Sequence, residues 1–109
     1  MNDVIWSKDA TEEFEFIIDY TIEHFSIKIA EETYSKIIRK IEKVKELPNI
    51  GKIVPELKEI GLTSYRELIE VPWRIIYRKE AKSIMVISII DSRRNMEEIL
   101  YRKIIDGRM

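Results

Sequence analysis

Residues 65–90 read YRELIEVPWRIIYRKEAKSIMVISII, and this stretch decides the fold of the chain. It contains three apolar, β-branched or aromatic runs, 65–71, 73–79 and 84–90, which are separated by short breaks. Such runs are typical of β-strands, and short breaks between them are typical of antiparallel hairpins. The stretch therefore predicts a three-stranded antiparallel meander.

Two amphipathic helices are expected before the meander. Ser7 is suited to cap a helix over roughly residues 8–24, where apolar side chains recur at steps of three and four residues. Ser26 is suited to cap a second helix, which ends near Leu47 because Pro48 cannot continue it. A connection of only a few residues makes the pair an antiparallel helical hairpin.

The remaining segments complete one compact α+β domain over residues 1–109, since a chain of this length fits a single core. A short opening strand is expected at 3–6, a loop at 48–64, and a last helix after the cap residue Asn95. The predicted order is β-α-α-β-β-β-α, with the helical hairpin packed on one side of a small, mainly antiparallel sheet. One shared core is expected there, formed by Phe14, Ile18, Ile37, Ile41, Ile75, Tyr77 and Ile87.

Composition excludes several classes of protein. The chain has no cysteine, so a disulfide framework, a thiolate metal site and a cysteine nucleophile are all absent. The single histidine, His24, has no second ligand at metal-binding spacing and is expected in a surface or helix-capping role, so no metal and no cofactor are expected. The longest apolar run, 84–90, is too short to span a bilayer. We expect a cytoplasmic protein that does not bind membranes.

The net charge of −1 hides a polarity along the chain. Residues 1–35 carry nine acids and two lysines, a net charge of −7, whereas residues 36–109 carry seventeen bases and eleven acids, a net charge of +6. An anion would therefore be bound by the later part. One basic stripe is expected on the second helix, either as a solvated face that pairs with Glu32 and Glu42 or as a nucleic-acid contact. Its members are Lys36, Arg39, Lys40 and Lys43.

Arginines on and just after the meander form a more specific candidate site. Several guanidinium groups at one level of a sheet make a fork-shaped receptor for phosphate. Strand alternation puts Arg74 and Arg78 on the same face. Glu56, in the preceding loop, is a general base if it approaches that face and a solvent-facing acid otherwise, and spacing alone favours the second role. The candidate arginines are Arg66, Arg74, Arg78, Arg93 and Arg94.

The place of Arg66 depends on the first hairpin of the meander. A two-residue loop, Val71-Pro72, puts Arg66 opposite Tyr77, away from the face of Arg74. A three-residue loop puts Arg66 opposite Ile76, on that face. A nuclease site needs the second register, or a bulge that restores it.

Four motifs in sequence order resemble the RelE/ParE superfamily of type II toxin–antitoxin toxins, which includes plasmid-stabilisation toxins. They are VPEL at 54–57, YREL at 65–68, WRIIYR at 73–78 and DSRRNMEEIL at 91–100. The opening Ile5-Trp6-Ser7 and the helical hairpin extend the likeness over nearly the whole chain. The resemblance implies a small toxin that arrests growth and that a cognate antitoxin protein holds inactive.

The superfamily divides by target. ParE-like members poison DNA gyrase without hydrolysing anything, whereas RelE-like and YoeB-like members cleave mRNA in the ribosomal A site. For such a nuclease, the resemblance implies catalytic roles for Glu56, Arg66, Arg74 and Arg93. This sequence departs from the RelE pattern, because Leu68 stands where RelE has a lysine and Tyr101 is displaced from the RelE tyrosine position.

Several features favour the ParE-like alternative. A pI near 5.9 provides little of the global positive charge with which proteins bind ribosomal RNA. The long helical hairpin and the Arg93-Arg94 pair also resemble ParE. In a toxin of this kind, Arg74, Arg78, Arg93 and Arg94 are the candidate target-binding residues. The remaining alternative is an inactive protein of the toxin fold that acts only by binding a partner. A second copy of the chain is an expected partner when the antitoxin is absent.

Overall fold

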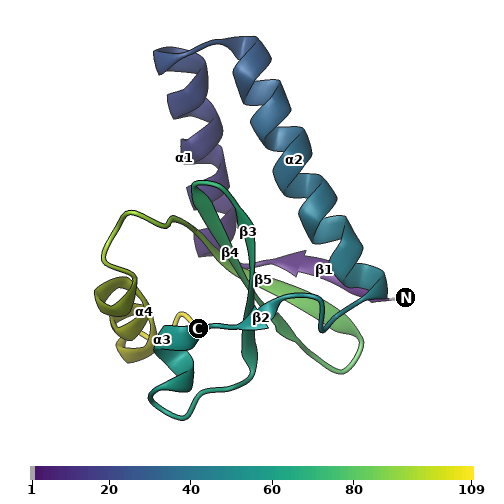
Figure 1. Cartoon of the computed structure of the whole chain (residues 1–109), viewed down its shortest axis with the longest axis vertical. Coiled ribbons are helices and arrows are strands. Elements are labelled where there is room, and N and C mark those ends of the chain that lie inside the picture. The colour runs from purple at the N-terminus through teal and green to yellow at the C-terminus, as the bar shows by residue number, and fades with distance from the viewer. Residues whose placement is uncertain (1) are drawn as a thin grey trace.

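The helical hairpin forms as the sequence predicts. The structure is a computed structural model that describes residues 2–109, and in it α1 spans Lys8–His24 and α2 spans Ile27–Glu46. The side-chain oxygens of Ser7 and Ser26 accept hydrogen bonds from amide groups in the first turns of these helices, so both predicted caps are present. The two helices lie side by side, and their connected ends project away from the sheet (Figure 1).

Five strands form one mixed sheet in the order β1-β5-β4-β3-β2. β1 (Asp3–Trp6) runs parallel to β5 (Ser83–Asp91), and all other neighbouring pairs are antiparallel. β3 (Tyr65–Glu70), β4 (Trp73–Lys79) and β5 form the predicted meander. The predicted α+β architecture, with the hairpin packed against a mainly antiparallel sheet, is therefore confirmed.

The segment predicted as a loop holds two short elements that the sequence analysis missed. β2 (Lys52–Ile53) pairs with β3, and α3 (Pro55–Lys58) is a single helical turn. A strand of two residues and a helix of four residues contain too few positions to show a hydrophobic period. α4 (Met96–Ile105) begins after its predicted cap, Asn95, whose side-chain oxygen accepts a hydrogen bond from the amide of Glu98.

The sheet separates two apolar cores. The first lies between the sheet and the helical hairpin and includes six of the predicted core residues, namely Phe14, Ile18, Ile37, Ile41, Ile75 and Tyr77. The prediction for Ile87 is wrong, because this side chain packs on the opposite face with residues of α3 and α4. Its strand is apolar at nearly every position, so alternation in the sequence does not indicate a face. A bulge in the β4–β5 pairing also falls at this residue.

Candidate functional site

Arg74 is the centre of a polar cluster on the sheet face that packs against α3 and α4. Its two terminal nitrogens donate to the two carboxylate oxygens of Glu56, with an Nη1–Oε2 distance of 3.0 Å and an Nη2–Oε1 distance of 2.7 Å. Its Nε donates to Glu67 Oε1 at 2.7 Å, and Nη2 lies 2.6 Å from the same oxygen. All three guanidinium nitrogens are therefore engaged by two carboxylates.

This pairing changes the chemistry of both Arg74 and Glu56. The Arg74 side chain is 12% exposed and that of Glu67 is 1% exposed, so little of the guanidinium faces solvent. The hydrogen bonds from Arg74 lower the pKa of Glu56, although partial burial acts in the opposite direction. A carboxylate with a lowered pKa is a weaker general base, because it has less affinity for the proton that it must accept.

The β3–β4 hairpin takes the register of the two-residue loop. Arg66 pairs with Tyr77, so its side chain lies on the face of the sheet toward the helical hairpin. There its Nη1 donates to the carbonyl oxygen of Gly51 at 2.7 Å. The side chain of Arg74 lies on the other face. The bulge lies between β4 and β5 and leaves the β3–β4 pairing continuous. Arg74 and Arg78 therefore share one face of the sheet, as predicted, and Arg66 lies on the other.

The other candidate arginines differ in how free their side chains are. Arg78 donates to the hydroxyl of Tyr65 at 3.0 Å and lies 5.5 Å from the centre of that ring. Arg93 is 76% exposed and forms an ion pair with Asp91, with an Nη2–Oδ2 distance of 2.5 Å. This pair lowers the pKa of Asp91. Arg94 is exposed and forms no ion pair within the described part of the chain.

Tyr101, on α4, lies among carboxylates. Partial burial and the negative charges of Glu97, Glu59 and Glu56 raise the pKa of its phenol. A phosphate that approached Tyr101 would meet these charges rather than the cations that stabilise a phosphoryl transition state. Within residues 2–109, no group of three or more carboxylate or histidine side chains is placed to hold a metal ion.

Phe16, Tyr20 and His24 form an aromatic row on the exposed side of α1 that was not predicted from the sequence. Phe16 and Tyr20 stack with ring centres 6.1 Å apart, and Tyr20 and His24 stack at 3.9 Å. Phe16 is 69% exposed and Tyr20 is 46% exposed. The signal in the sequence is the spacing of four residues between these side chains, which sets them together on a face otherwise occupied by acids. His24 lies at the helix end, as predicted, with Nδ1 3.1 Å from the carbonyl oxygen of Tyr20.

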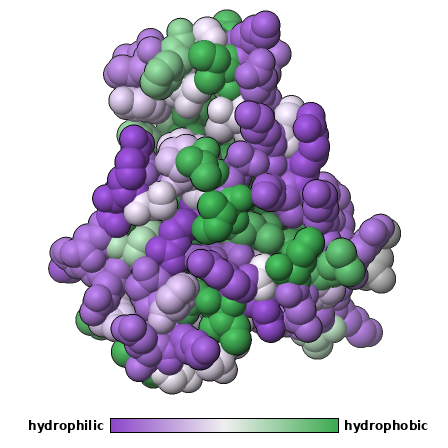
Figure 2. Space-filling model, in the orientation of Figure 1, coloured by the Kyte–Doolittle hydropathy of each residue, from purple (hydrophilic) through white to green (hydrophobic). Residues whose placement is uncertain are grey.

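A cleft beside the aromatic row combines apolar walls with a charged rim. Phe16, Tyr20, Trp73 and Ile89 contribute its apolar side chains, and Arg93 and Arg94 stand at its rim with Glu12, Glu13 and Asp91. Further apolar surface lies at the free end of the hairpin (Figure 2), where Phe25 is 66% and Ile27 is 63% exposed. Exposed aromatic and arginine side chains next to apolar walls are typical of protein-binding surfaces.

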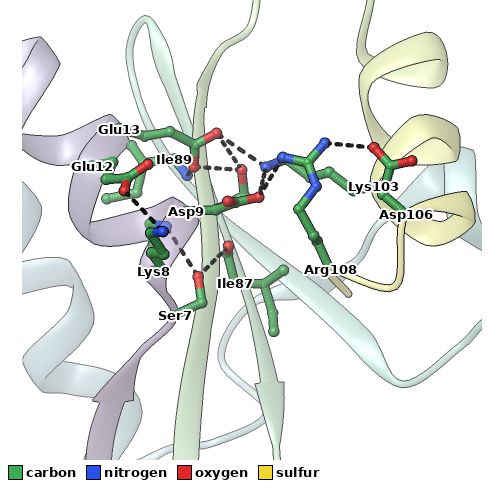
Figure 3. A network of polar contacts seen from close by, with 12 residues as sticks. Ser7, Lys8, Asp9, Glu12, Glu13, Ile87, Ile89, Lys103, Asp106 and Arg108 are labelled. Carbon is green, nitrogen blue, oxygen red and sulfur yellow. Dashed lines mark hydrogen bonds and ion pairs between the residues drawn. The ribbon is translucent and has the colours of Figure 1, made fainter.

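Buried ion pairs tie α4 to the first turns of α1 (Figure 3). Lys103, whose side chain is 4% exposed, places Nζ 2.5 Å from Asp9 Oδ2 and 3.2 Å from Glu13 Oε2. Arg108 Nη1 lies 3.0 Å from the same Asp9 oxygen. Burial opposes the ionisation of Asp9, but the hydrogen bonds and charges of Lys103 and Arg108 outweigh it and lower the pKa of Asp9. Glu13 also accepts a hydrogen bond from the Ile89 amide, at the edge of β5 beyond the end of β1.

Comparison with known proteins identifies the family of the chain and a solved structure that shares its fold. The model of the family described as the ParE toxin of the type II toxin–antitoxin system, parDE, matches residues 4–96. No curated protein matches the chain. Among solved structures, the chain is similar to one described as the chromosomal ParDE TA system from P. aeruginosa, with 19% sequence identity and a TM-score of 0.68. That match covers 84% of this chain and 96% of the other, and it shows that the two chains share a fold.

Proposed function

The chain belongs to the ParE toxin family of type II toxin–antitoxin systems, and we propose that it inhibits DNA gyrase without hydrolysing nucleic acid. ParE-like members of the superfamily act on gyrase, which supports this target over the ribosome. The toxin would act on gyrase in the cytoplasm. There the antitoxin would bind the toxin and hold it inactive.

The ion pairs of Arg74 with Glu56 and Glu67 are the observation that supports a mechanism without hydrolysis. Cleavage of RNA by its own 2′-hydroxyl needs a base, cations for the charge on the phosphorane and an acid for the leaving oxygen. In this chain Glu56 and Arg74 bind each other, and Arg66 lies on the opposite face of the sheet. The three requirements are therefore not met at one place.

Arg93 and Arg94 are the arginines that we assign to the target. Both are exposed at the rim of the cleft, whereas Arg74 and Arg78 are held by partners within the chain. Arg94 forms no ion pair within residues 2–109 and can bind a partner without breaking one, whereas Arg93 is paired with Asp91 on the exposed surface.

The apolar cleft and the aromatic row are the surface that we assign to the antitoxin. An amphipathic helix or an extended segment places apolar anchors in such a cleft and leaves its polar side in water. In the absence of the antitoxin, the same surface would promote association between copies of the toxin.

Two assays on the purified toxin test the proposed mechanism. Wild type is expected to inhibit supercoiling by gyrase and to leave translated mRNA without new primer-extension stops. Replacing both rim arginines, Arg93→Ala with Arg94→Ala, is expected to weaken gyrase inhibition at least about tenfold, as loss of charged contacts in an interface does. Cuts at defined codon positions that disappear in Arg74→Ala would overturn the proposal and establish the mRNA nuclease.

A further inference from the structure

One face of α2 carries four cations that form no ion pair with any side chain of residues 2–109. They are Lys36, Arg39, Lys40 and Lys43, and we refer to them as the α2 ridge. Steps of three and four residues place these side chains together on one side of the helix. The neutralisation expected from neighbouring acids does not occur, since Glu42 pairs with Lys45 at 2.9 Å instead. The ridge therefore carries four positive charges without an ion pair, and Glu31 and Glu32 lie near its first two members, Lys36 and Arg39.

The α2 ridge borders a groove between α2 and the β2–β3 edge of the sheet. Lys40 and Lys43 line this groove from the helix, and Lys52 lines it from β2. The only acid among the lining residues is Glu67, whose side chain is 1% exposed and lies 2.6 Å from Arg74. Lys52 is 3.5 Å from Glu67 and keeps 64% of its side chain exposed. The groove thus presents lysine ammonium groups to solvent with little opposing charge.

The lysines of this surface suit phosphate better than protein, and Ile50, Leu68 and Ile69 supply the apolar part of the groove. Lysine is depleted at protein–protein interfaces, whereas lysine and arginine supply most contacts to the phosphates of nucleic acids. No aromatic side chain lines the groove, so unpaired bases would find no stacking platform there. These features favour the backbone of a duplex over a single strand.

Six of the twenty acids lie on α1, and α2 itself carries four, namely Glu31, Glu32, Glu42 and Glu46. Residues 36–45, which hold the α2 ridge, contain five bases and one acid. A duplex that approached the α2 ridge would meet positive charge locally, although the whole chain has a net charge of −1. Local charge decides such binding at close range, because salt screens interactions beyond about 10 Å.

We propose that the α2 ridge and Lys52 form a binding site for the phosphate backbone of double-stranded DNA. Binding is independent of base sequence, since lysines contact phosphates as point charges. The site is distinct from the cleft assigned to the antitoxin and does not depend on which cellular target the toxin inhibits.

The test measures binding of a fluorescein-labelled duplex of random sequence to the full toxin chain, without gyrase or antitoxin, by fluorescence anisotropy at several salt concentrations. The test variant is Lys40→Glu with Lys43→Glu. The matched control is Lys8→Glu with Lys82→Glu, which changes the net charge equally at exposed positions outside the ridge. A third variant, Lys40→Arg with Lys43→Arg, keeps the charge of the ridge.

Wild type, the control and the arginine variant are expected to bind with similar affinities. The test variant should bind at least about tenfold more weakly at about 50 mM salt, and the slope of log affinity against log salt should fall by about 2, because two phosphate contacts are lost. If circular dichroism shows that the charge-reversed chain is unfolded, Lys40→Gln with Lys43→Gln replaces it and should lose the same two phosphate contacts. The proposal is overturned if wild type does not bind, or if the control loses as much affinity as the test variant. Weaker binding of the antitoxin by the test variant, without any DNA binding, would instead make the ridge a protein interface.

Discussion

The guanidinium of Arg74 joins three segments that are separate in the sequence. It is carried by β4, and it holds Glu56 of α3 and Glu67 of β3 in one cluster. Glu67 is buried, and a buried carboxylate without a cation is strongly destabilising. The motifs indicate Arg74 as a phosphate ligand. In the isolated chain its guanidinium instead links three segments through ion pairs.

Removing this cation should therefore lower stability. We expect Arg74→Met to reduce the free energy of unfolding by about 3 kcal/mol or more, because Glu67 is left buried with only the exposed Lys52 nearby. Urea denaturation at pH 7 measures the change. Arg78→Met is the control on the same strand and face, and a loss as large as that of Arg74→Met would contradict the argument.

Two ion-paired carboxylates predict how stability depends on pH. The pKa values of Glu56 and Asp9 are lower in the folded protein than their ordinary values. The folded state therefore holds these protons less tightly than the unfolded chain, so their contribution to stability is complete above about pH 5 and is lost as the pH falls further. Glu56→Gln should show a smaller loss of stability between about pH 5 and about pH 3 than wild type. Urea midpoints across this range measure it, and an unchanged pH profile would show that Glu56 makes no such contribution.

At the scale of elements, the molecule is held together by contacts between distant parts of the chain. The helical hairpin packs on one face of the sheet through an apolar core. α4 packs on the other face through a second core, and Lys103 and Arg108 attach it to the beginning of α1 (Figure 3). The beginning of α1 and the C-terminal segment are therefore linked by ion pairs, while their apolar side chains pack in different cores.

The position of α4 should depend on its buried lysine. Lys103→Met leaves Glu13 and Asp9 without their closest cation, and we expect a loss of about 3 kcal/mol in the free energy of unfolding. Amide hydrogen exchange should also become faster in α4 than in α2, because the lost contacts hold the C-terminal helix. Arg102→Met is the control, since this neighbouring side chain is exposed. Equal effects of the two variants would contradict a special role for Lys103.

At the scale of the whole molecule, different surfaces carry different chemistry. The exposed side of α1 combines aromatic side chains with acids, and α2 carries the unpaired cations of the ridge. The surface proposed for DNA is therefore separate from the cleft, where the surfaces proposed for the antitoxin and the target adjoin. This separation would let one small domain engage more than one partner.

The aromatic row should govern both self-association and antitoxin binding. Phe16→Glu with Tyr20→Glu removes exposed apolar surface, so the purified toxin should stay monomeric at concentrations at which wild type associates. Antitoxin affinity should fall at least about tenfold, because aromatic anchors dominate such interfaces. Analytical ultracentrifugation and calorimetry measure the two effects. Ile105→Glu, at an 83% exposed position on α4, is the control, and unchanged antitoxin affinity in the double variant would place the docking surface elsewhere.

The sequence by itself determined the longer elements and six residues of the first core. Serine caps, helical spacing and apolar runs are local signals, and they predicted α1, α2, α4 and the meander. Six of seven core residues followed from the same periodicity. Ile87 did not, because a strand that is buried on both faces has no alternation to read. β2 and α3 were missed because they are too short to form a period.

Only the tertiary structure decided what the charged side chains do. The sequence left two registers open for the β3–β4 hairpin, and backbone pairing selected the one that separates Arg66 from Arg74. The partners of Arg74 come from different elements, so no spacing within a single element could reveal them. Local periodicity follows from the geometry of one helix or strand, whereas an ion pair needs two elements to be brought within about 4 Å by the packing of the whole chain. For this reason the fold could be predicted from motifs, while the state of its arginines could not.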